Sequence, residues 1–169
     1  RGKYIALCEG DDYWTDPYKL QKQVDFLEAN PDFSACFHNA EVLNEKGEKV
    51  LFHKKPMKES YDFNQIIAGW FAPTASLLFR NNPSLQKTMS DFVKYKFVSG
   101  DRLLLALLGN QGKINYMPEN MSVYRKHAGG ISSWGDRVKI FSSNVKLFKA
   151  LKKYFKNKYN SALNTQIFR

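Results

Sequence analysis

Three acidic side chains near the start of the chain have types and spacing that suit metal-assisted phosphate chemistry. Glu9, Asp11 and Asp12 lie within four residues, directly after the apolar run at 4–8. Like charges at this spacing repel each other unless a cation compensates them. Carboxylate oxygens suit Mg²⁺ or Mn²⁺, which take a few carboxylates together with substrate phosphates. The cluster indicates a cation site, and a solvated acidic turn before the next helix is an equally supported interpretation.

The elements on either side of this cluster would place it at the end of a strand. The run at 4–8 has no polar alternation, which predicts a strand buried on both faces, typical of a parallel sheet under helices. Ligand sites in open α/β sheets lie at the carboxyl ends of such strands. Asp16 followed by Pro17 predicts an N-cap and the first position of a helix that ends at Asn30. The apolar stripe of this helix is expected at Leu20, Val24 and Leu27.

The rest of the chain alternates predicted strands and helices. Strands are predicted at 33–43, 49–52, 74–79, 113–117 and 121–124. Helices are predicted at 63–69, 82–92 and 103–108, the last ended by Gly109. Residues 53–62 predict a loop, and 127–135, rich in Gly and Ser, predict a mobile loop. This alternation gives an α/β class.

The charge of the chain is unevenly distributed. Lys and Arg number 26 and Asp and Glu 16, for a net charge of +10. Residues 137–169 hold nine of the basic residues and no acid, so 1–136 are nearly neutral. This pattern argues against a nucleic-acid partner and for a local electrostatic role at the C-terminus. No run approaches the ~20 apolar residues that a membrane-spanning helix needs.

The two cysteines, Cys8 and Cys36, both lie in apolar runs. A zinc site needs about four ligands at close spacing, and the sequence shows no such set. We therefore expect two small buried side chains in a reducing compartment, which favours a cytoplasmic location.

Four motifs extend the acidic cluster along the chain. The first is the stretch 2–14 with Pro17, Lys19-Leu20 and Gln23, and the second is 74–80. The third is Ser99-Gly100-Asp101 before a leucine run, and the fourth is Tyr124-Arg125-Lys126-His127 with Gly129, Gly130 and Ser132. In this order, to about residue 135, they resemble the middle and end of a family 2 glycosyltransferase. Two positions depart from the family pattern: Glu9 stands for the first Asp of the metal motif, and Gly100 for the Glu before Asp101.

The resemblance implies a fold and an organisation. The fold would be the C-terminal, catalytic and acceptor portion of a GT-A type fold, with a mixed sheet flanked by helices. Residues 1–135 would form the partial glycosyltransferase domain, and 136–169 a basic amphipathic helical segment. We expect the family's N-terminal nucleotide-binding half upstream of Arg1. A sheet without those strands would expose an edge, which favours a homo-oligomer.

The resemblance also implies an activity: inverting transfer of a sugar from a nucleoside-diphosphate donor to a glycan or lipid-linked acceptor, in cell-surface polysaccharide synthesis. Asp11 would bind Mn²⁺ or Mg²⁺. Glu9 would face the ribose or the waters of the metal, and Asp12 would hold the loop or the sugar. Arg125 and His127 would neutralise the diphosphate. The alternative is a non-catalytic interaction domain that keeps the fold.

On the acceptor side, Asp101 would be the general base, and a plain acid at a helix N-terminus is its alternative role. Trp14, Trp70 and Phe71 could form an apolar wall beside the sugar, with core or rim packing as the alternative for each. For His127, an exposed loop position is equally supported.

The basic tail leaves two interpretations open. An apolar stripe recurs at helical spacing, and most of the lysines fall off it. The stripe comprises Phe141, Val145, Phe148, Leu151, Phe155 and Tyr159. Either this stripe packs on the domain and the basic face is solvated, or the helix lies aromatics-down on an anionic membrane. The second interpretation would place the protein peripherally at the inner face of the cell membrane, near lipid-linked acceptors.

Overall fold

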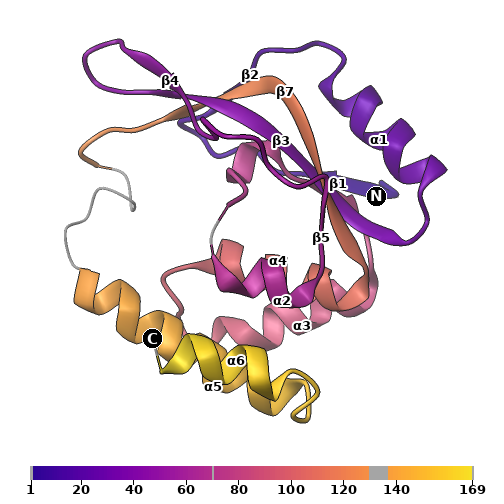
Figure 1. Cartoon of the computed structure of the whole chain (residues 1–169), viewed down its shortest axis with the longest axis vertical. Coiled ribbons are helices and arrows are strands. Elements are labelled where there is room, and N and C mark those ends of the chain that lie inside the picture. The colour runs from indigo at the N-terminus through magenta and orange to yellow at the C-terminus, as the bar shows by residue number, and fades with distance from the viewer. Residues whose placement is uncertain (1, 70, 130–136, 169) are drawn as a thin grey trace.

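The computed structural model describes residues 2–69, 71–129 and 137–168. They form one mixed, seven-stranded sheet with helices on both faces (Figure 1). The strands are β1 (Tyr4–Ala6), β2 (Tyr13–Trp14), β3 (Phe33–Leu43), β4 (Lys49–Leu51), β5 (Ser60–Tyr61), β6 (Leu78–Arg80) and β7 (Lys113–Arg125). The main order is β1-β6-β3-β7-β2, with β4 beside β3 and β5 beside β7. The α/β class is confirmed in this form, and β2 and β5 are strands that the sequence did not predict.

The two long strands β3 and β7 run parallel at the centre of the sheet. The sequence predicted two short strands where β7 is continuous. His38 pairs with Met117 and Asn39 with Asn120, so two residues of β7 bulge out between these pairs. One of them is Pro118, which has no N–H to donate to a neighbouring strand and therefore fits a bulge.

β1 differs from its prediction in its pairing. It lies at the edge of the sheet and pairs antiparallel with β6, rather than in a parallel arrangement. Its alternate side chains pack on opposite faces: Tyr4 and Ala6 against a small core under one helix, and Ile5 against the main core. Cys8, just beyond the strand, is exposed, contrary to expectation, because the chain leaves the sheet there.

The helices are α1 (Lys19–Ala29), α2 (Phe63–Ala68), α3 (Pro83–Val93), α4 (Gly100–Gln111), α5 (Arg137–Tyr154) and α6 (Asn160–Ile167). α1 covers one face of the sheet, and α2 to α6 gather on the other (Figure 1). The predicted strand at 74–79 begins instead as a 3₁₀ turn, η1 (Thr74–Ser76), before β6. Asp16 does not cap α1: its Oδ1 accepts the N–H of Tyr18, and the helix begins at Lys19.

The buried face of α1 is polar where the sequence predicted an apolar stripe. Lys19, Gln23 and Leu27 are buried, whereas Leu20 is 40% exposed. The Lys19 ammonium donates to Gln23 Oε1 at 2.8 Å, and Gln23 Nε2 donates to the carbonyl of Ser76 at 2.9 Å. Because these polar groups hydrogen-bond to each other and to the main-chain carbonyl of Ser76, their burial is compatible with a stable helix.

Glycine ends α4 later than predicted. The helix continues through Gly109, where an added Cβ would lie 2.6 Å from Ile66 Cδ1 of α2. Gly109 is therefore a packing residue that lets α2 and α4 approach closely. The helix ends at Gly112, where a Cβ would lie 2.5 Å from the carbonyl oxygen of Asp32.

The C-terminal helices belong to the main core. Leu147, Phe148, Leu151 and Phe155, together with Leu163 of α6, are at most 8% exposed. The basic C-terminal segment is thus helical, as expected, and the middle of its apolar stripe packs on the body. No helix in the described part of the chain is both long and apolar enough to cross a membrane.

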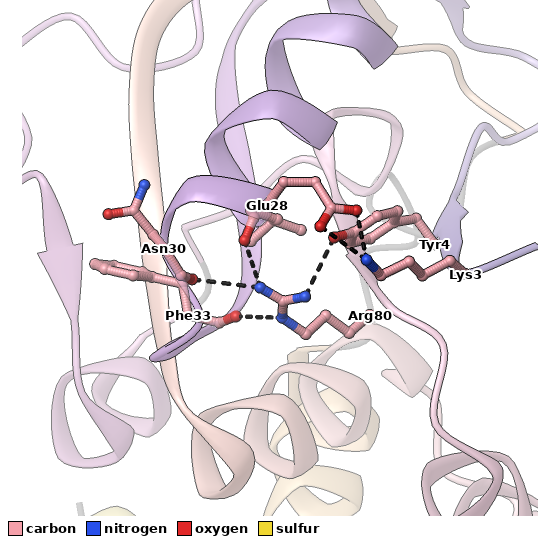
Figure 2. Close-up of polar contacts among 7 residues, drawn as sticks. Lys3, Tyr4, Glu28, Asn30, Phe33 and Arg80 are labelled. Carbon is pink, nitrogen blue, oxygen red and sulfur yellow. Dashed lines mark hydrogen bonds and ion pairs between the residues drawn. The ribbon is translucent and has the colours of Figure 1, made fainter.

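Arg80 at the end of β6 joins three elements (Figure 2). Its guanidinium donates to the carbonyls of Leu27 and Asn30 at the end of α1, and to that of Phe33 at the start of β3. A further N–H donates to the Tyr4 hydroxyl of β1 at 3.2 Å. One side chain therefore satisfies helix-end carbonyls that would otherwise lack donors.

Candidate functional site

The acidic residues lie in a loop between β1 and β2, which we call the acid loop (residues 9–12). β2 pairs antiparallel with the far end of β7, through Tyr13 with Val123. β7 is also parallel to β3, so the carboxyl end of β7 leaves the sheet beside the acid loop. The topology thus brings the first and fourth sequence motifs together.

Asp12 fastens the acid loop to the end of β7. Its side chain is 8% exposed, and Oδ1 accepts the N–H of Arg125 at 2.9 Å. Oδ2 is buried and has no hydrogen-bond partner among the described residues. Burial raises the pKa of Asp12, and the Arg125 N–H opposes that rise. Ionising the buried Asp12 carboxyl therefore costs free energy, and such perturbed groups are typical of functional sites.

Asp11 points toward the loop that follows β7. Its Oδ2 lies 2.9 Å from His127 Nε2, and both side chains are more than 40% exposed. The hydrogen bond from His127 lowers the pKa of Asp11. Asp11 is therefore an accessible carboxylate with an imidazole at its side.

Glu9 connects the acid loop with two further segments. Burial raises the pKa of Glu9, and the negative charges of Asp12, Asp11 and Asp101 raise it further. A side-chain hydrogen bond from Thr74 of η1 acts in the opposite direction. Asp101 lies in the first turn of α4, where its Oδ1 accepts the N–H of Arg102 at 2.8 Å. Residues from all four sequence motifs therefore influence the pKa of Glu9 or of Asp11.

Beneath the acid loop, Trp14 and Lys19 form a support. The Trp14 indole N–H donates to the carbonyl of Ala75 in η1 at 2.9 Å, and the Lys19 ammonium lies 4.4 Å from the indole centroid. Burial lowers the pKa of Lys19 to about 8. Because Trp14 and Gln23 both bind carbonyls of η1, they fix the turn that carries Thr74 toward Glu9.

The remaining predicted residues take other positions. Phe71 stacks on Tyr61 with centroids 4.6 Å apart and packs against Phe37, so its ring joins the aromatic core. Trp70, Gly130 and Ser132 lie outside the described residues. Arg125 is exposed, and its charge lowers the pKa of Asp11 to a small extent. Of the expected acceptor wall, the described structure brings only Trp14 to the acid loop.

Sequence reasoning missed the supporting roles of Gln23 and Thr74. Lys19 and Gln23 were noted as a family pattern, but their burial was not foreseen. Their i, i+4 spacing in phase with Leu27 was the available signal, because it places all three on one helix face. For Thr74 no local signal existed, since its contact with Glu9 depends on how the sheet folds.

The acid loop has few side chains that suit a metal ion. Within residues 2–69, 71–129 and 137–168, no group of three or more His, Cys, Asp and Glu side chains is arranged to hold one. Asp11 and Glu9 supply carboxylates that are accessible and mutually repulsive. In general, Mg²⁺ and Mn²⁺ can be held by one or two carboxylates when phosphates and water complete the shell.

No protein-family model matches the chain. The chain is similar to uncharacterized proteins from Mycobacterium bovis and from two strains of Mycobacterium tuberculosis, each 38% identical over 146 residues. The match covers 85% of this chain but 41% of each relative, so the chain spans about two fifths of the length of these curated relatives. Their names assign no activity, and function rests on the geometry described above.

Proposed function

We propose that the chain is the catalytic and acceptor-side portion of an inverting, metal-dependent glycosyltransferase of family 2, with a GT-A type fold. The donor is a nucleoside-diphosphate sugar and the acceptor a hydroxyl of a glycan or lipid-linked glycan. The observation that carries the proposal is the convergence of four segments distant in sequence. Asp11 Oδ2 lies 2.9 Å from His127 Nε2. The negative charge of Asp101 raises the pKa of Glu9, and the side chain of Thr74 hydrogen-bonds to Glu9.

The acid loop suits the diphosphate end of the donor. Asp11, with Glu9 beside it, would hold the cation, and a bound Mn²⁺ or Mg²⁺ supplies Lewis-acid stabilisation of the charge on the departing diphosphate. His127 and Arg125 lie on the same side and add positive charge or hydrogen-bond donors for phosphate oxygens. Asp12 keeps these groups in place through its bond to the Arg125 N–H.

Asp101 serves as the general base. The acceptor oxygen attacks the anomeric carbon, the bond from that carbon to the diphosphate breaks, and the acceptor proton passes to the Asp101 carboxylate. Asp101 lies in the first turn of α4, where the helix presents the positive end of its dipole. Trp14, 37% exposed and held by its indole N–H, offers an apolar edge for the sugar.

The test is titration calorimetry of a nucleoside-diphosphate sugar, with and without Mn²⁺, on the longest polypeptide that contains this chain. The parent should bind in a Mn²⁺-dependent manner, and Asp11→Asn should weaken that binding at least about tenfold. Asp91→Asn, which removes an exposed acid from α3, is the matched control and should bind like the parent.

Two results would count against the proposal. If Asp11→Asn keeps the Mn²⁺-dependent affinity of the parent, Asp11 is not in the donor site. If the parent neither binds the donor nor transfers sugar to an acceptor, the non-catalytic interaction domain becomes the better account.

A further inference from the structure

The outer face of α5 carries a row of lysines along its whole length. Lys139, Lys146, Lys149 and Lys153 follow a helical spacing of seven, three and four residues, and Lys156 continues it just past the helix end. All five are exposed. Since residues three, four and seven apart share one face of a helix, the row forms a single line of positive charge.

From Leu147 onward, the opposite face of α5 packs in the core. Leu147, Phe148 and Leu151 are at most 4% exposed. From Leu147 onward the apolar stripe therefore cannot turn toward an outside surface, as one sequence interpretation required, without unpacking the core. What α5 presents outward is the lysine row, and in Figure 1 this helix lies at the edge of the molecule away from the sheet.

Three lysines in the middle and last turns of the row have no counter-charge among the described residues. Lys146, Lys149 and Lys153 make no hydrogen bond or ion pair with the rest of the described chain. Residues 137–169 contain no acid at all. Three exposed lysines on one face without counter-charges attract a polyanionic surface.

Apolar side chains stand beside the first turns of the row. Val138 is 78% exposed and Phe141 is 53% exposed, both near the start of α5. In Figure 1 this end of α5 lies on the same side of the view as the carboxyl end of β7. A line of lysines with apolar groups at one end suits a bilayer interface, where lysines meet anionic headgroups and apolar groups enter the acyl boundary.

We propose that the outer face of α5 is a docking surface for an anionic lipid bilayer. The 18 residues of α5 make a helix about 27 Å long, which can lie flat along the headgroups. Nucleic acid is the weaker partner, because the body is nearly neutral and Val138 and Phe141 would have no use against phosphates. The inference goes beyond glycosyl transfer, since it requires neither donor nor turnover.

The experiment is vesicle co-sedimentation of the 169-residue chain. The probes are vesicles of phosphatidylcholine alone and of phosphatidylcholine mixed with phosphatidylglycerol. The parent should sediment with the mixed vesicles only, and less as salt rises. Replacing Lys146, Lys149 and Lys153 by Gln should weaken the partition about 100-fold, from about fivefold for each lysine.

The matched control replaces Lys46, Lys55 and Lys87 by Gln, which removes the same charge from exposed positions outside α5. This variant should lose less than about threefold, because its lysines are not on the docking face. Phe141→Ser should weaken the partition without changing its salt dependence, because it removes apolar contact alone.

Three results would overturn the proposal. One is equal sedimentation of parent and row variant with mixed vesicles. Another is an equal loss in the row variant and its control, which would mean that net charge alone attracts the chain. The third is absence of parent binding to mixed vesicles, including the case in which single-stranded RNA binds through the same three lysines.

Discussion

The main-chain N–H of Arg125 donates to Asp12 Oδ1 at 2.9 Å, across 113 residues of sequence. This bond closes the acid loop onto the end of β7. It leaves the other carboxylate oxygen of Asp12 buried and without a partner among the described residues. The bond therefore orders the loop while the negative charge that makes it is disfavoured by burial.

Comparing Asp12→Asn with Asp12→Ala should distinguish the effect of the hydrogen bond on stability from the effect of the negative charge. Asp12→Ala removes the acceptor and should lower the free energy of unfolding by about 1–2 kcal/mol. Asp12→Asn keeps an oxygen acceptor and removes the charge, so it should be as stable as the parent or more stable. Urea denaturation of the three proteins measures this, and equal loss in both variants would contradict it.

The same pair predicts a pH dependence. The pKa of Asp12 is raised above its ordinary 3.8, so the folded protein holds a proton at pH values where the unfolded chain has lost it. Stability from this group is therefore lost as the pH rises from 3.8 through the folded pKa. The advantage of Asp12→Asn over the parent should grow across this window, and a constant difference would show that Asp12 titrates normally.

Asp101→Asn should lower sugar-transfer turnover by about two to four orders of magnitude, because the base can no longer accept the acceptor proton. Donor affinity should not change, since Asn keeps an oxygen for the Arg102 N–H and the donor contacts lie in the acid loop. Steady-state kinetics with donor calorimetry measure both, with Asp91→Asn as control. Near-normal turnover would reduce Asp101 to a helix-start residue.

Lys19 predicts a rise of stability at alkaline pH. Its pKa is lowered from 10.5 to about 8 in the folded protein. Between these values the unfolded chain binds the proton that the folded chain has released, so the free energy of unfolding increases with pH. The rise should be of the order of 3 kcal/mol and absent in Lys19→Met.

Urea denaturation at a series of pH values measures this rise as the difference between the parent and Lys19→Met. Lys22→Met is the control, because Lys22 pairs with Asp16 on the exposed side and its pKa is raised rather than lowered. If Lys19→Met shows the same alkaline slope as the parent, the pKa of Lys19 is not lowered by folding.

Gly112→Ala should destabilise the protein by about 1–3 kcal/mol through overpacking. The added Cβ would lie 2.5 Å from the Asp32 carbonyl oxygen and 3.0 Å from the Ser34 nitrogen, both main-chain atoms that cannot rotate away. Gly69→Ala is the control, since nothing lies within 4 Å of its Cβ position. Thermal unfolding of both variants gives the comparison, and equal Tm values would mean that α4 and β3 can separate at no cost.

Elements governed by neighbours in the chain were predictable from the sequence. The helix predicted at 82–92 is α3, capped by Asn82 with Pro83 at its first position. The strand predicted at 49–52 contains β4, which returns on β3 after the turn at 44–47. These signals are local, because a cap or a hairpin turn uses residues only a few positions apart.

Elements governed by distant partners were not predictable. The burial of Gln23 depends on the carbonyl of Ser76, which lies 53 residues away, so a hydropathy pattern favoured Leu20 instead. Similarly, α4 does not end at Gly109. The absence of a Cβ at this residue instead lets Ile66 of α2 pack closely against the helix. A pattern along one segment carries no information on what the fold packs against it.

The candidate site divides in the same way. The acid loop was visible as three carboxylates within four residues, but its contact with His127 spans 116 residues. Only the order of the four motifs suggested that their segments meet. The supporting roles of Trp14 and Thr74 follow from the position of η1, which the sequence predicted as part of a strand.

The parallel pairing of β3 with β7 also determines the order in which parts of the sheet can form. Phe33 begins a register with Lys113, so the centre of the sheet cannot close until β7 has left the ribosome. Before that point a nascent chain holds α1, β3 and the hairpin to β4, with one side of β3 unpaired. Long-range pairing of this kind folds slowly because the chain between the strands must lose its freedom first. The contacts of Asp12 with Arg125 and of Asp11 with His127 thus form only after β7 has been made. A prematurely released chain would expose a strand edge that other chains can join.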